Sequence, residues 1–508
     1  MSLLGLDVGT TGTKGVAFDI EGKPIASAYR EYPLLSPKPG WQELEPEHVW
    51  RCVREVLGEV AQKTKHDPIR AMAMSAQGEA VLAVDKTGAV LTNSPVTFDA
   101  RTADIPAWWL ERMSRMELAQ ISGMPLHGMY SLNKILWLKQ NQPEIFSKAH
   151  RFHCYEDFVQ LRLGLEPIMS NSLAARTMAL DARKGDWSQE LLDIAGVPRE
   201  KFPRTAQSGT VVGTISDSVA DEIGLPHGIV VSTGGHDQPA GALGAGILES
   251  GEAVYATGTV DCICPIYKTY SVTEQTVAGN LCCYPSCVPG LFASIAFNFT
   301  GGSLLKWYRD TFAAEELREA DAAGKDVYEI LCDRIPAEPE KLLILPHFTV
   351  TGTPHFDTAS RGAILGLTLN TTRPELVSAV LSGVTYEMKL NLEMLQSAGV
   401  GISRLRAIGG GAKSAVWTQR KADIMGIPVA VLETTEAASL GVALLAGQAA
   451  GLVTDLKAAL GNAVRISYVC EPDTARAREY AERYGVYREV YEALKDINHR
   501  LAALDRAS

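Results

Sequence analysis

The feature that most constrains this chain is a strand–turn–strand pattern that occurs twice. The first copy lies within Leu3–Ile20 and places the glycine- and threonine-rich turn Gly9–Lys14 between two short strands. The second copy is shorter, lies within Ala253–Pro265, and has Thr257-Gly258-Thr259 as its turn. Two halves built around such hairpins and facing each other would enclose a cleft. The pattern therefore predicts an α/β protein of two related halves.

An acid at the end of the first strand gives the first hairpin a chemical use. Asp7 precedes a turn whose glycines let a polyanion approach the backbone, while threonine hydroxyls and backbone N–H groups can cradle phosphate oxygens. Mg2+ keeps several waters and uses few protein carboxylates, so Asp7 can hold this ion through water. An ordinary β-hairpin, with Asp7 as a turn former, explains the same residues. The hairpin alone leaves both interpretations open.

Length and charge exclude several classes of protein. A chain of 508 residues predicts about two to four domains, and its net charge of -11 argues against a nucleic-acid-binding surface. The N-terminus has no basic stretch followed by an apolar one, and no apolar run approaches the length of a transmembrane helix. We therefore expect a cytoplasmic protein without a signal peptide or a membrane span.

The nine cysteines are too few for a disulfide scaffold in a chain of this length. Five of them crowd one segment, at Cys262, Cys264, Cys282, Cys283 and Cys287. Their spacings lack the paired C-x2-C of a zinc site. Buried thiols on adjacent strands are the favoured interpretation, with a metal site as the alternative.

The remaining pattern predicts mixed sheets flanked by helices. Hairpins near the N-terminus are followed by a crossover helix at Glu45–Ala61 and a strand at Ile69–Ser75, which is typical of a mixed sheet. The region from residue 103 to about residue 192 is predicted to be largely helical. A long helix is predicted at Arg373–Ala398, and a charged, solvated helix or helix pair at Thr474–Leu504.

A second glycine run lies where a nucleotide can rest against bare backbone. Gly409–Gly411 follows a predicted strand at Leu405–Ile408 and precedes a predicted helix at Trp417–Met425. The run is not a P-loop, because Ala412 stands where that motif has the glycine before its lysine. A tight structural turn is the alternative.

Asp237 has two compatible interpretations. It follows the predicted strand Ile229–Thr233 and a glycine pair, and it precedes a helix of small residues at Ala240–Gly246. An acid facing the cleft can accept the proton of a substrate hydroxyl, and phosphoryl transfer needs little other covalent help from a protein. Taken alone, a helix N-cap is favoured. His236 has no second ligand at metal spacing, so we expect a structural or substrate-contacting histidine.

Four polar side chains lie beside or just after strand ends in the first half: Gln77, Glu79, Asp99 and Arg101. Acids and amides of this kind are well suited to hydrogen-bonding a polyhydroxylated ligand. For each residue taken singly, a role as a surface turn residue is the alternative.

Together these motifs resemble the FGGY family of carbohydrate kinases, which share the actin-like ATPase fold. Asp7–Thr11 looks like the family's first phosphate loop, and Met129–Leu138 is similar to the first family signature through its lysine and tryptophan. Gly362–Leu381 is similar to the second signature until Ser382, where the family usually has an acid or amide. The block from Gly409 to Gly441 is similar to the adenine-binding region. The resemblance covers nearly the whole chain.

The resemblance implies two ribonuclease H-like domains, with mixed sheets flanked by helices and a cleft between them. Residues 1–248 would form the N-terminal domain, with the sugar site, the phosphate loop and the catalytic base. Residues 249–508 would form the nucleotide-binding C-terminal domain and its helical tail.

The resemblance also implies site roles. Asp237 corresponds to the catalytic base and Asp7 to the acid of the Mg2+ site. The implied ligand contacts are Thr10, Thr11, Gly258 and Thr259 for phosphates, Gly410, Gly411 and Ala412 for the nucleotide, and Gln77, Asp99, Arg101 and His236 for the sugar.

We therefore expect a kinase that uses ATP and Mg2+ to phosphorylate a hydroxyl of an open-chain ketose such as xylulose. A polyol kinase of the glycerol or erythritol type is the alternative, and a non-metabolic actin-like ATPase is the alternative from another class. The family usually has other residues at Thr97, at Gly78-Glu79 and at His236, so the identity of the sugar stays open. The expected partner is a small molecule, and a homodimer is a further option.

Overall fold

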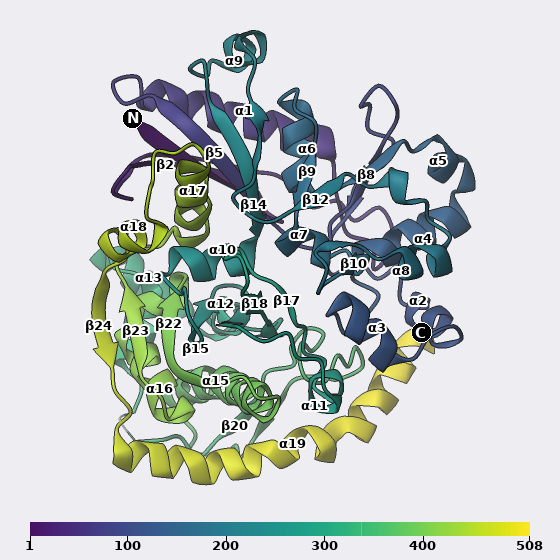
Figure 1. The fold of residues 1–508 in the computed structure, drawn as a ribbon. Coiled ribbons are helices and arrows are strands. Elements are labelled where there is room, and N and C mark those ends of the chain that lie inside the picture. The colour runs from purple at the N-terminus through teal and green to yellow at the C-terminus, as the bar shows by residue number, and fades with distance from the viewer. Residues whose placement is uncertain (337, 508) are drawn as a thin grey trace.

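The computed structural model describes residues 1–336 and 338–507, which form two α/β halves around two large mixed sheets (Figure 1). In the described part of the chain the first sheet has six strands in the order β13-β14-β5-β1-β2-β3. Their bounds are β1 (Ser2–Val8), β2 (Gly12–Asp19), β3 (Pro24–Glu31), β5 (Ile69–Ala76), β13 (Val211–Thr214) and β14 (Val230–His236).

The second sheet repeats the central pairings of the first. Just as β1 lies antiparallel to β2 and parallel to β5, β15 lies antiparallel to β16 and parallel to β22. The strands of this sheet are β15 (Gly251–Thr257), β16 (Asp261–Tyr267), β17 (Tyr284–Pro285), β18 (Phe292–Ala293), β19 (Ala296–Asn298), β22 (Ile402–Ile408), β23 (Val429–Leu432) and β24 (Ile466–Cys470). The predicted α/β class and the repeated hairpin are confirmed.

Helices cover the sheets of both halves. The first half contains α1 (Pro46–Lys63), α2 (Ile105–Leu110), α3 (Arg115–Ser122), α4 (Ser131–Asn141), α5 (Pro143–Lys148), α6 (Tyr155–Arg162), α7 (Asn171–Ala175), α8 (Gln189–Ala195), α9 (Asp217–Ile223) and α10 (Asp237–Gly244). The second half contains α11 (Glu274–Ala278), α12 (Gly302–Phe312), α13 (Ala314–Ala323), α14 (Val327–Asp333), α15 (Arg373–Ser397), α16 (Ala415–Met425), α17 (Ala437–Ala449), α18 (Leu456–Ala463) and α19 (Thr474–Ala507).

Four short strands interrupt the region that the sequence predicts as largely helical, residues 103 to about 192: β8, β9, β10 and β11. The smaller sheets pair β4 (Glu43–Leu44) with β7 (Ser94–Pro95), β6 (Leu82–Val84) with β8 (Arg151–His153), β9 (Ile168–Ser170) with β12 (Arg204–Ala206), β10 (Leu180–Asp181) with β11 (Asp186–Trp187), and β20 (Leu343–Leu345) with β21 (Ala363–Leu365). Strands of two or three residues are too short to show a period of two in the sequence.

The tail is one long helix with a buried aromatic stripe. The sequence predicts a solvated face, and most charged residues of α19 are indeed exposed. Tyr480, Tyr484, Tyr487 and Tyr491, however, recur at helical spacing and pack with Tyr386 of α15 in one apolar cluster. This stripe fastens α19 along one edge of the second half, where it is drawn in yellow (Figure 1).

All nine cysteines are free and buried. Cys262 and Cys264 lie on β16, as expected, whereas Cys282, Cys283 and Cys287 lie in the segments on either side of β17. Within the described ranges, no group of three metal-ligating side chains is arranged around a site. None of the described helices combines the length and the apolar character needed to span a membrane.

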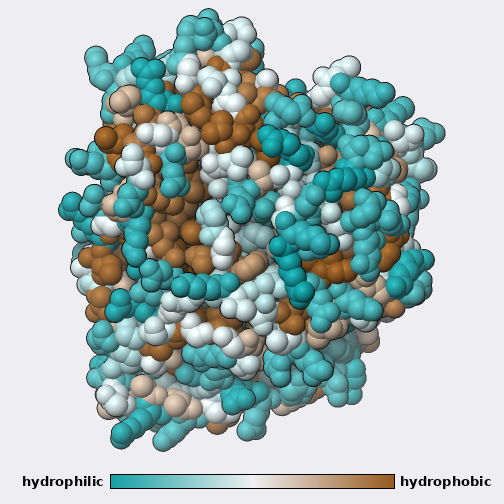
Figure 2. Space-filling view, in the orientation of Figure 1, coloured by the Kyte–Doolittle hydropathy of each residue, from teal (hydrophilic) through white to brown (hydrophobic). Residues whose placement is uncertain are grey.

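Glycines let the two halves approach closely. Helix α17 of the second half packs on α10 and on β1 and β5 of the first sheet. A Cβ at Gly5 of β1 would lie 1.9 Å from the carbonyl oxygen of Ser439, and a Cβ at Gly244 would lie 1.6 Å from that of Ala437. Figure 2 shows apolar residues gathered on the left of this face, around α17 and α18, on a surface that is otherwise largely hydrophilic.

We predict that Gly5→Ala destabilises the protein, because its methyl group must displace the backbone of α17. Overpacking of this kind costs about 1–3 kcal/mol. The measurement is the free energy of unfolding from urea titration. Gly485→Ala is the matched control: Gly485 lies in α19 with no atom within 4 Å of an added Cβ, so this change should be neutral or stabilising. Equal effects of the two substitutions would contradict the prediction.

Candidate functional site

The carboxyl ends of three parallel strands meet at one edge of the first sheet. β1 and β14 both run parallel to β5 and flank it. Asp7 of β1 and Gly235 of β14 each pair with Ser75 of β5, so Asp7 and Asp237 emerge on either side of the same strand end. Ligands of open α/β sheets bind beyond this edge.

The first hairpin turn is held by the residue that follows β5. Nε2 of Gln77 donates to the carbonyl of Gly9 at 3.0 Å, and Oγ1 of Thr10 donates to Oε1 of Gln77 at 3.0 Å. Oη of Tyr32 donates to the same Gly9 carbonyl at 2.6 Å. The sequence assigns Gln77 to the sugar, but the structure places its amide as a support for the turn. Thr11 is exposed at the tip.

Asp237 begins α10 without capping it. The N-cap position belongs to His236, so the N-cap interpretation of Asp237 is wrong. Among the described residues, no donor makes a well-aligned hydrogen bond to Oδ1 of Asp237, although Nε2 of His236 lies 3.1 Å away. Burial, together with the charges of Asp7 and Glu79, raises the pKa of Asp237 to about 7. A carboxylate with that pKa and an oxygen still available suits a general base near neutral pH.

Negative charge is crowded around Asp7. Burial raises the pKa of Asp7, and the charge of Glu436 acts in the same direction, against a hydrogen bond from Ser75. Glu436 comes from the second half and forms an ion pair with Lys14 at 2.6 Å. A divalent cation beside Asp7 and Asp237 would relieve this crowding. The donor set therefore fits an ion that keeps most of its waters, as Mg2+ does.

Glu79 has an unusual backbone, and each oxygen of its carboxylate accepts a hydrogen bond. Its φ of 64° lies in the left-handed region, which is uncommon for residues other than glycine and is concentrated at functional sites. Nε of Arg176 donates to Oε1 of Glu79 at 2.6 Å, and Oγ1 of Thr97 donates to Oε2 at 2.8 Å. Arg176 comes from the end of α7, where no sequence motif pointed to it.

The second contact of Arg176 is with soft acceptors. Its Nη1 donates to Sδ of Met124 at 3.4 Å and to Sγ of Cys282 at 3.8 Å, and its guanidinium lies over the rings of Tyr130 and Tyr284 at 5.3 and 5.4 Å. Sulfur is a weak acceptor, so these two hydrogen bonds of Nη1 are weak. No local pattern in the sequence singles out Arg176, because only the folded chain brings it to Glu79.

His236 links the base to the second half. Its Nδ1 lies 3.0 Å from Oη of Tyr284, in hydrogen-bonding contact. Burial and the nearby Arg176 cation hold the pKa of His236 well below its usual value, so the ring is neutral. His236 therefore lies between Asp237 and the Arg176–Glu79 pair, consistent with the expected structural or substrate-contacting role.

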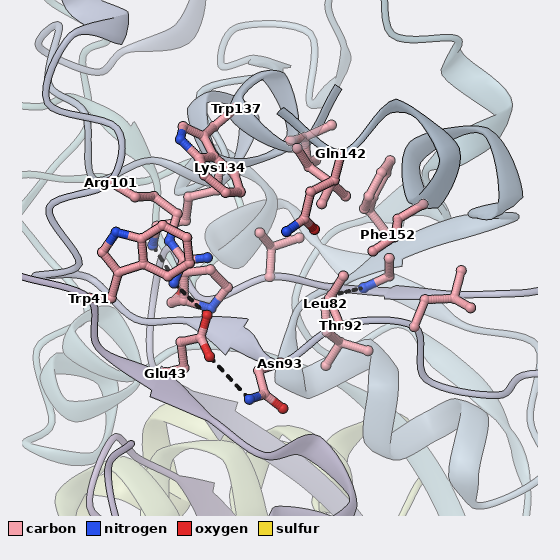
Figure 3. Close-up of a pocket in the computed structure, with 17 residues that line it drawn as sticks. Trp41, Glu43, Leu82, Thr92, Asn93, Arg101, Lys134, Trp137, Gln142 and Phe152 are labelled. Atoms are coloured by element: carbon pink, nitrogen blue, oxygen red, sulfur yellow. Dashed lines mark hydrogen bonds and ion pairs between the residues drawn. The ribbon is translucent and has the colours of Figure 1, made fainter. Parts of the chain in front are cut away.

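Asp99 and Arg101 belong to a cluster with Glu43 and two tryptophans. Figure 3 shows Arg101, Glu43, Trp41 and Trp137 of this cluster. Nε of Arg101 donates to Oδ1 of Asp99 at 2.8 Å and its Nη2 to Oε1 of Glu43 at 2.5 Å. The guanidinium lies 3.9 Å from the ring centre of Trp41 and 5.2 Å from that of Trp137. A cavity of about 170 Å³ is bordered by Trp41, Glu43, Arg101 and Trp137. The resemblance implies that Asp99 and Arg101 contact the sugar. In the structure their side chains form an ion pair with each other.

The turns after β15 and β22 line a cavity of about 860 Å³ in the second half. These strands are parallel neighbours, so both turns lie at the same sheet edge. A Cβ at Gly411 would lie 2.2 Å from Cγ2 of Thr257, so only glycine fits where the turns meet. Ala412 differs, because its side chain is buried in the core beneath the turn. Of the predicted nucleotide and phosphate contacts, the lining includes Gly258, Thr259, Gly410 and Gly411.

Lys421, a buried lysine, supports the second phosphate turn. No pattern in the sequence pointed to it. Nζ of Lys421 on α16 donates to Oγ1 of Thr257 and lies 4.3 and 4.5 Å from the ring centres of Tyr255 and Trp417. Asp261 lies nearby: burial raises its pKa to about 6, and the Lys421 cation acts in the opposite direction. The two charges compensate each other beneath the turn.

Known proteins share this arrangement. Residues 2–244 match the N-terminal domain of the FGGY family of carbohydrate kinases, and residues 253–450 match the C-terminal domain of the same family. The chain belongs to this family. It is therefore an ATP-dependent sugar kinase.

The similar proteins differ in the substrates they are named for. The xylulose kinase of Bacillus subtilis (strain 168) is 28% identical over 501 residues, which are 98% of each chain. The crystal structure of gluconate kinase from Lactobacillus acidophilus has a TM-score of 0.88 at 27% identity, and covers 97% of this chain and 98% of its own. The ligand-bound xylulose kinase from Lactobacillus acidophilus gives the same TM-score, identity and coverage. The predicted family and the actin-like fold are thus confirmed.

We predict that Lys421→Met strongly destabilises this FGGY kinase, because it leaves Asp261 buried without a counter-charge. Removing one partner of a buried pair costs about 3–5 kcal/mol, whereas replacing both partners is often neutral. The double variant Lys421→Met/Asp261→Asn should therefore unfold at a higher urea concentration than Lys421→Met alone. Additive losses in this double-mutant cycle would show that the two charges do not interact.

Proposed function

We propose that this FGGY kinase transfers the γ-phosphate of ATP to a hydroxyl of an open-chain ketose such as xylulose, with Mg2+ as the metal. The observation that carries the proposal is the meeting of Asp7, the first phosphate turn and the free oxygen of Asp237 at one sheet edge. Relatives named xylulose kinase and gluconate kinase act, by their names, on sugars or sugar acids, which supports an open-chain substrate.

In the proposed mechanism, Asp237 accepts the proton of the attacking hydroxyl through Oδ1. Thr10 and Thr11 on the first turn, and Gly258 and Thr259 on the second, orient the phosphates. Mg2+ held near Asp7 would neutralise charge on the transferring phosphoryl group. The bare backbone of Gly409–Gly411 leaves room for the nucleotide. Approach of the two halves excludes water, which competes with the sugar for the phosphoryl group.

We assign recognition of the sugar chiefly to His236 and to the Arg176–Glu79 pair, and not to Asp99 and Arg101. Arg176 offers Nη1 to a substrate oxygen, since its other acceptors are sulfurs. The carboxylate of Glu79 can accept from a sugar hydroxyl in addition to its contacts with Arg176 and Thr97. A cation beside hydroxyl acceptors suits a carbonyl-bearing sugar better than a simple polyol.

The test is ADP release with D-xylulose, D-gluconate, glycerol and erythritol at saturating MgATP. D-xylulose should raise ATP turnover well above the rate without an acceptor. Highest turnover with glycerol or erythritol would favour the polyol-kinase alternative, and highest turnover with gluconate would move the substrate to an aldonate. If no sugar or polyol in a wider panel raised turnover, the proposal would be wrong and a non-metabolic ATPase favoured.

We predict that Asp237→Asn lowers kcat by a factor of about 10² to 10⁴, the usual contribution of a general base. Binding of ATP, measured by calorimetry, should be nearly unchanged, because Asp237 lies at the edge of the first sheet and not in the nucleotide cavity. Asp221→Asn is the control, since Asp221 lies on exposed α9. Activity of Asp237→Asn close to that of the control would reassign the base.

We also predict a fall in kcat/KM for the sugar as the pH drops through about 7. Asp237 must be unprotonated to act as a base, and burial with neighbouring carboxylates raises its pKa to about 7 in the free protein. Below that pH the rate constant should fall about tenfold per pH unit. The measurement is a pH profile of kcat/KM with ATP binding followed over the same range. A flat profile down to about pH 5 would exclude this role for Asp237.

A further inference from the structure

Two side chains of the C-terminal helix α19 meet at one carboxylate in a loop of the second half. Oη of Tyr491 donates to Oδ2 of Asp357 at 3.0 Å, and Nε2 of His499 lies 2.7 Å from the same oxygen. The Tyr491 ring also stacks on His355, with centroids 3.7 Å apart and planes at 24°. Burial by itself would raise the pKa of Asp357, but hydrogen bonds from His499, the Ala359 N–H and Tyr491 hold it below its usual value. The carboxylate is thus kept ionised by the groups that hold it.

Residues 351–357 of this loop form a compact turn. The backbone N–H of Asp357 donates to Oγ1 of Thr351 at 2.6 Å, and that of Phe356 donates to the Gly352 carbonyl at 2.9 Å. Nδ2 of Asn280 donates to the Pro354 carbonyl at 2.7 Å. Phe356 itself has a φ of 47°, which a residue with a side chain adopts only when its surroundings enforce it. Asp357 is the next residue, so its contacts with Tyr491 and His499 of α19 restrict the backbone at Phe356.

Phe356 is the point at which this loop meets the first half. Its ring lies 4.7 Å from the ring of His127, which belongs to the segment between α3 and α4. Burial lowers the pKa of His127 to about 4, so its ring is neutral and packs as an aromatic group. The backbone N–H of Met129 donates to Nδ1 of His127 at 3.2 Å. Four residues after His127, Oγ of Ser131 donates to the carbonyl of Glu79 at 2.9 Å, which connects this segment to the Glu79–Arg176 pair.

We propose that Tyr491 and His499 of α19 are positioning residues for sugar binding: by fixing Asp357, they hold Phe356 against His127 and so close the two halves over the Glu79–Arg176 pair. This inference rests on the proposed sugar-kinase function. Tyr491 and His499 contact neither the phosphate turns nor the base, and they act only through the loop. Figure 1 shows α19 running along the edge of the molecule from the second half towards the side of α2 and α3. We call α19, with its Tyr491 and His499 contacts to Asp357, the strap.

The strap makes a specific kinetic prediction. Without the Tyr491 and His499 contacts to Asp357, Phe356 is no longer held against His127. The halves then shift towards a more open arrangement, which binds sugar less tightly. The double variant Tyr491→Phe/His499→Ala should therefore raise KM for D-xylulose about 3- to 10-fold, with kcat within about twofold and KM for ATP unchanged. Phe356→Ala should have the same effect. The triple variant should be no worse than either, because all three side chains act through one contact.

Tyr484→Phe is the matched control, because its hydroxyl donates to Oε2 of Glu393 at 2.7 Å, on α15 and away from the loop. It removes the same kind of bond from the same helix, so it should lower thermal stability without changing KM for the sugar. A strap variant that lowered stability like Tyr484→Phe but kept the wild-type KM for D-xylulose would overturn the inference. Wild-type protein inactive on every sugar would instead refute the proposed function.

Discussion

The structure depends on two acids that the first sheet brings to one place. Asp7 and the segment leading to Asp237 lie in register on either side of Ser75, because β1 and β14 both run parallel to β5. Parallel strands end at the same edge of a sheet, so the side chains at their carboxyl ends lie close together. Burial, together with the charges of Asp7 and Glu79, raises the pKa of Asp237 to about 7, which suits its proposed role as a general base. A cation beside Asp7 and Asp237 would offset the negative charge at this edge.

The two halves perform complementary parts of the same task. The first sheet edge presents a turn that Gln77 and Tyr32 hold by hydrogen bonds, together with the proposed base Asp237. The second edge presents paired turns, Thr257–Thr259 and Gly409–Gly411, over a cavity large enough for a nucleotide. Close packing of α17 on β1 and α10 joins the halves, since glycines leave no side chain between their backbones. In the proposed mechanism the reacting groups thus lie at strand ends, and the two halves meet through helices.

The sugar site that we propose is built from a different kind of structure. Glu79, Arg176 and His236 are brought together from a strained turn, a short helix and a strand end, and Tyr284 completes the group from the second half. Their contacts are buried and mutually dependent, so a change in one residue alters the positions of the others.

The sequence by itself determined the family, the repeated hairpin, the α/β class and the segments that carry Asp7, Asp237 and Gly409–Gly411, because hydrophobic periodicity and glycine-rich turns are local signals. Its N-cap interpretation of Asp237 is wrong, and no local pattern pointed to Arg176 or Lys421, because nothing local reveals a side chain's partner. Arg101 could turn to the sugar or to Asp99, and only the folded chain shows Asp99 and Glu43 already in contact with it. Tertiary structure decided these roles, since a buried charge takes whichever partner packing brings within hydrogen-bonding distance.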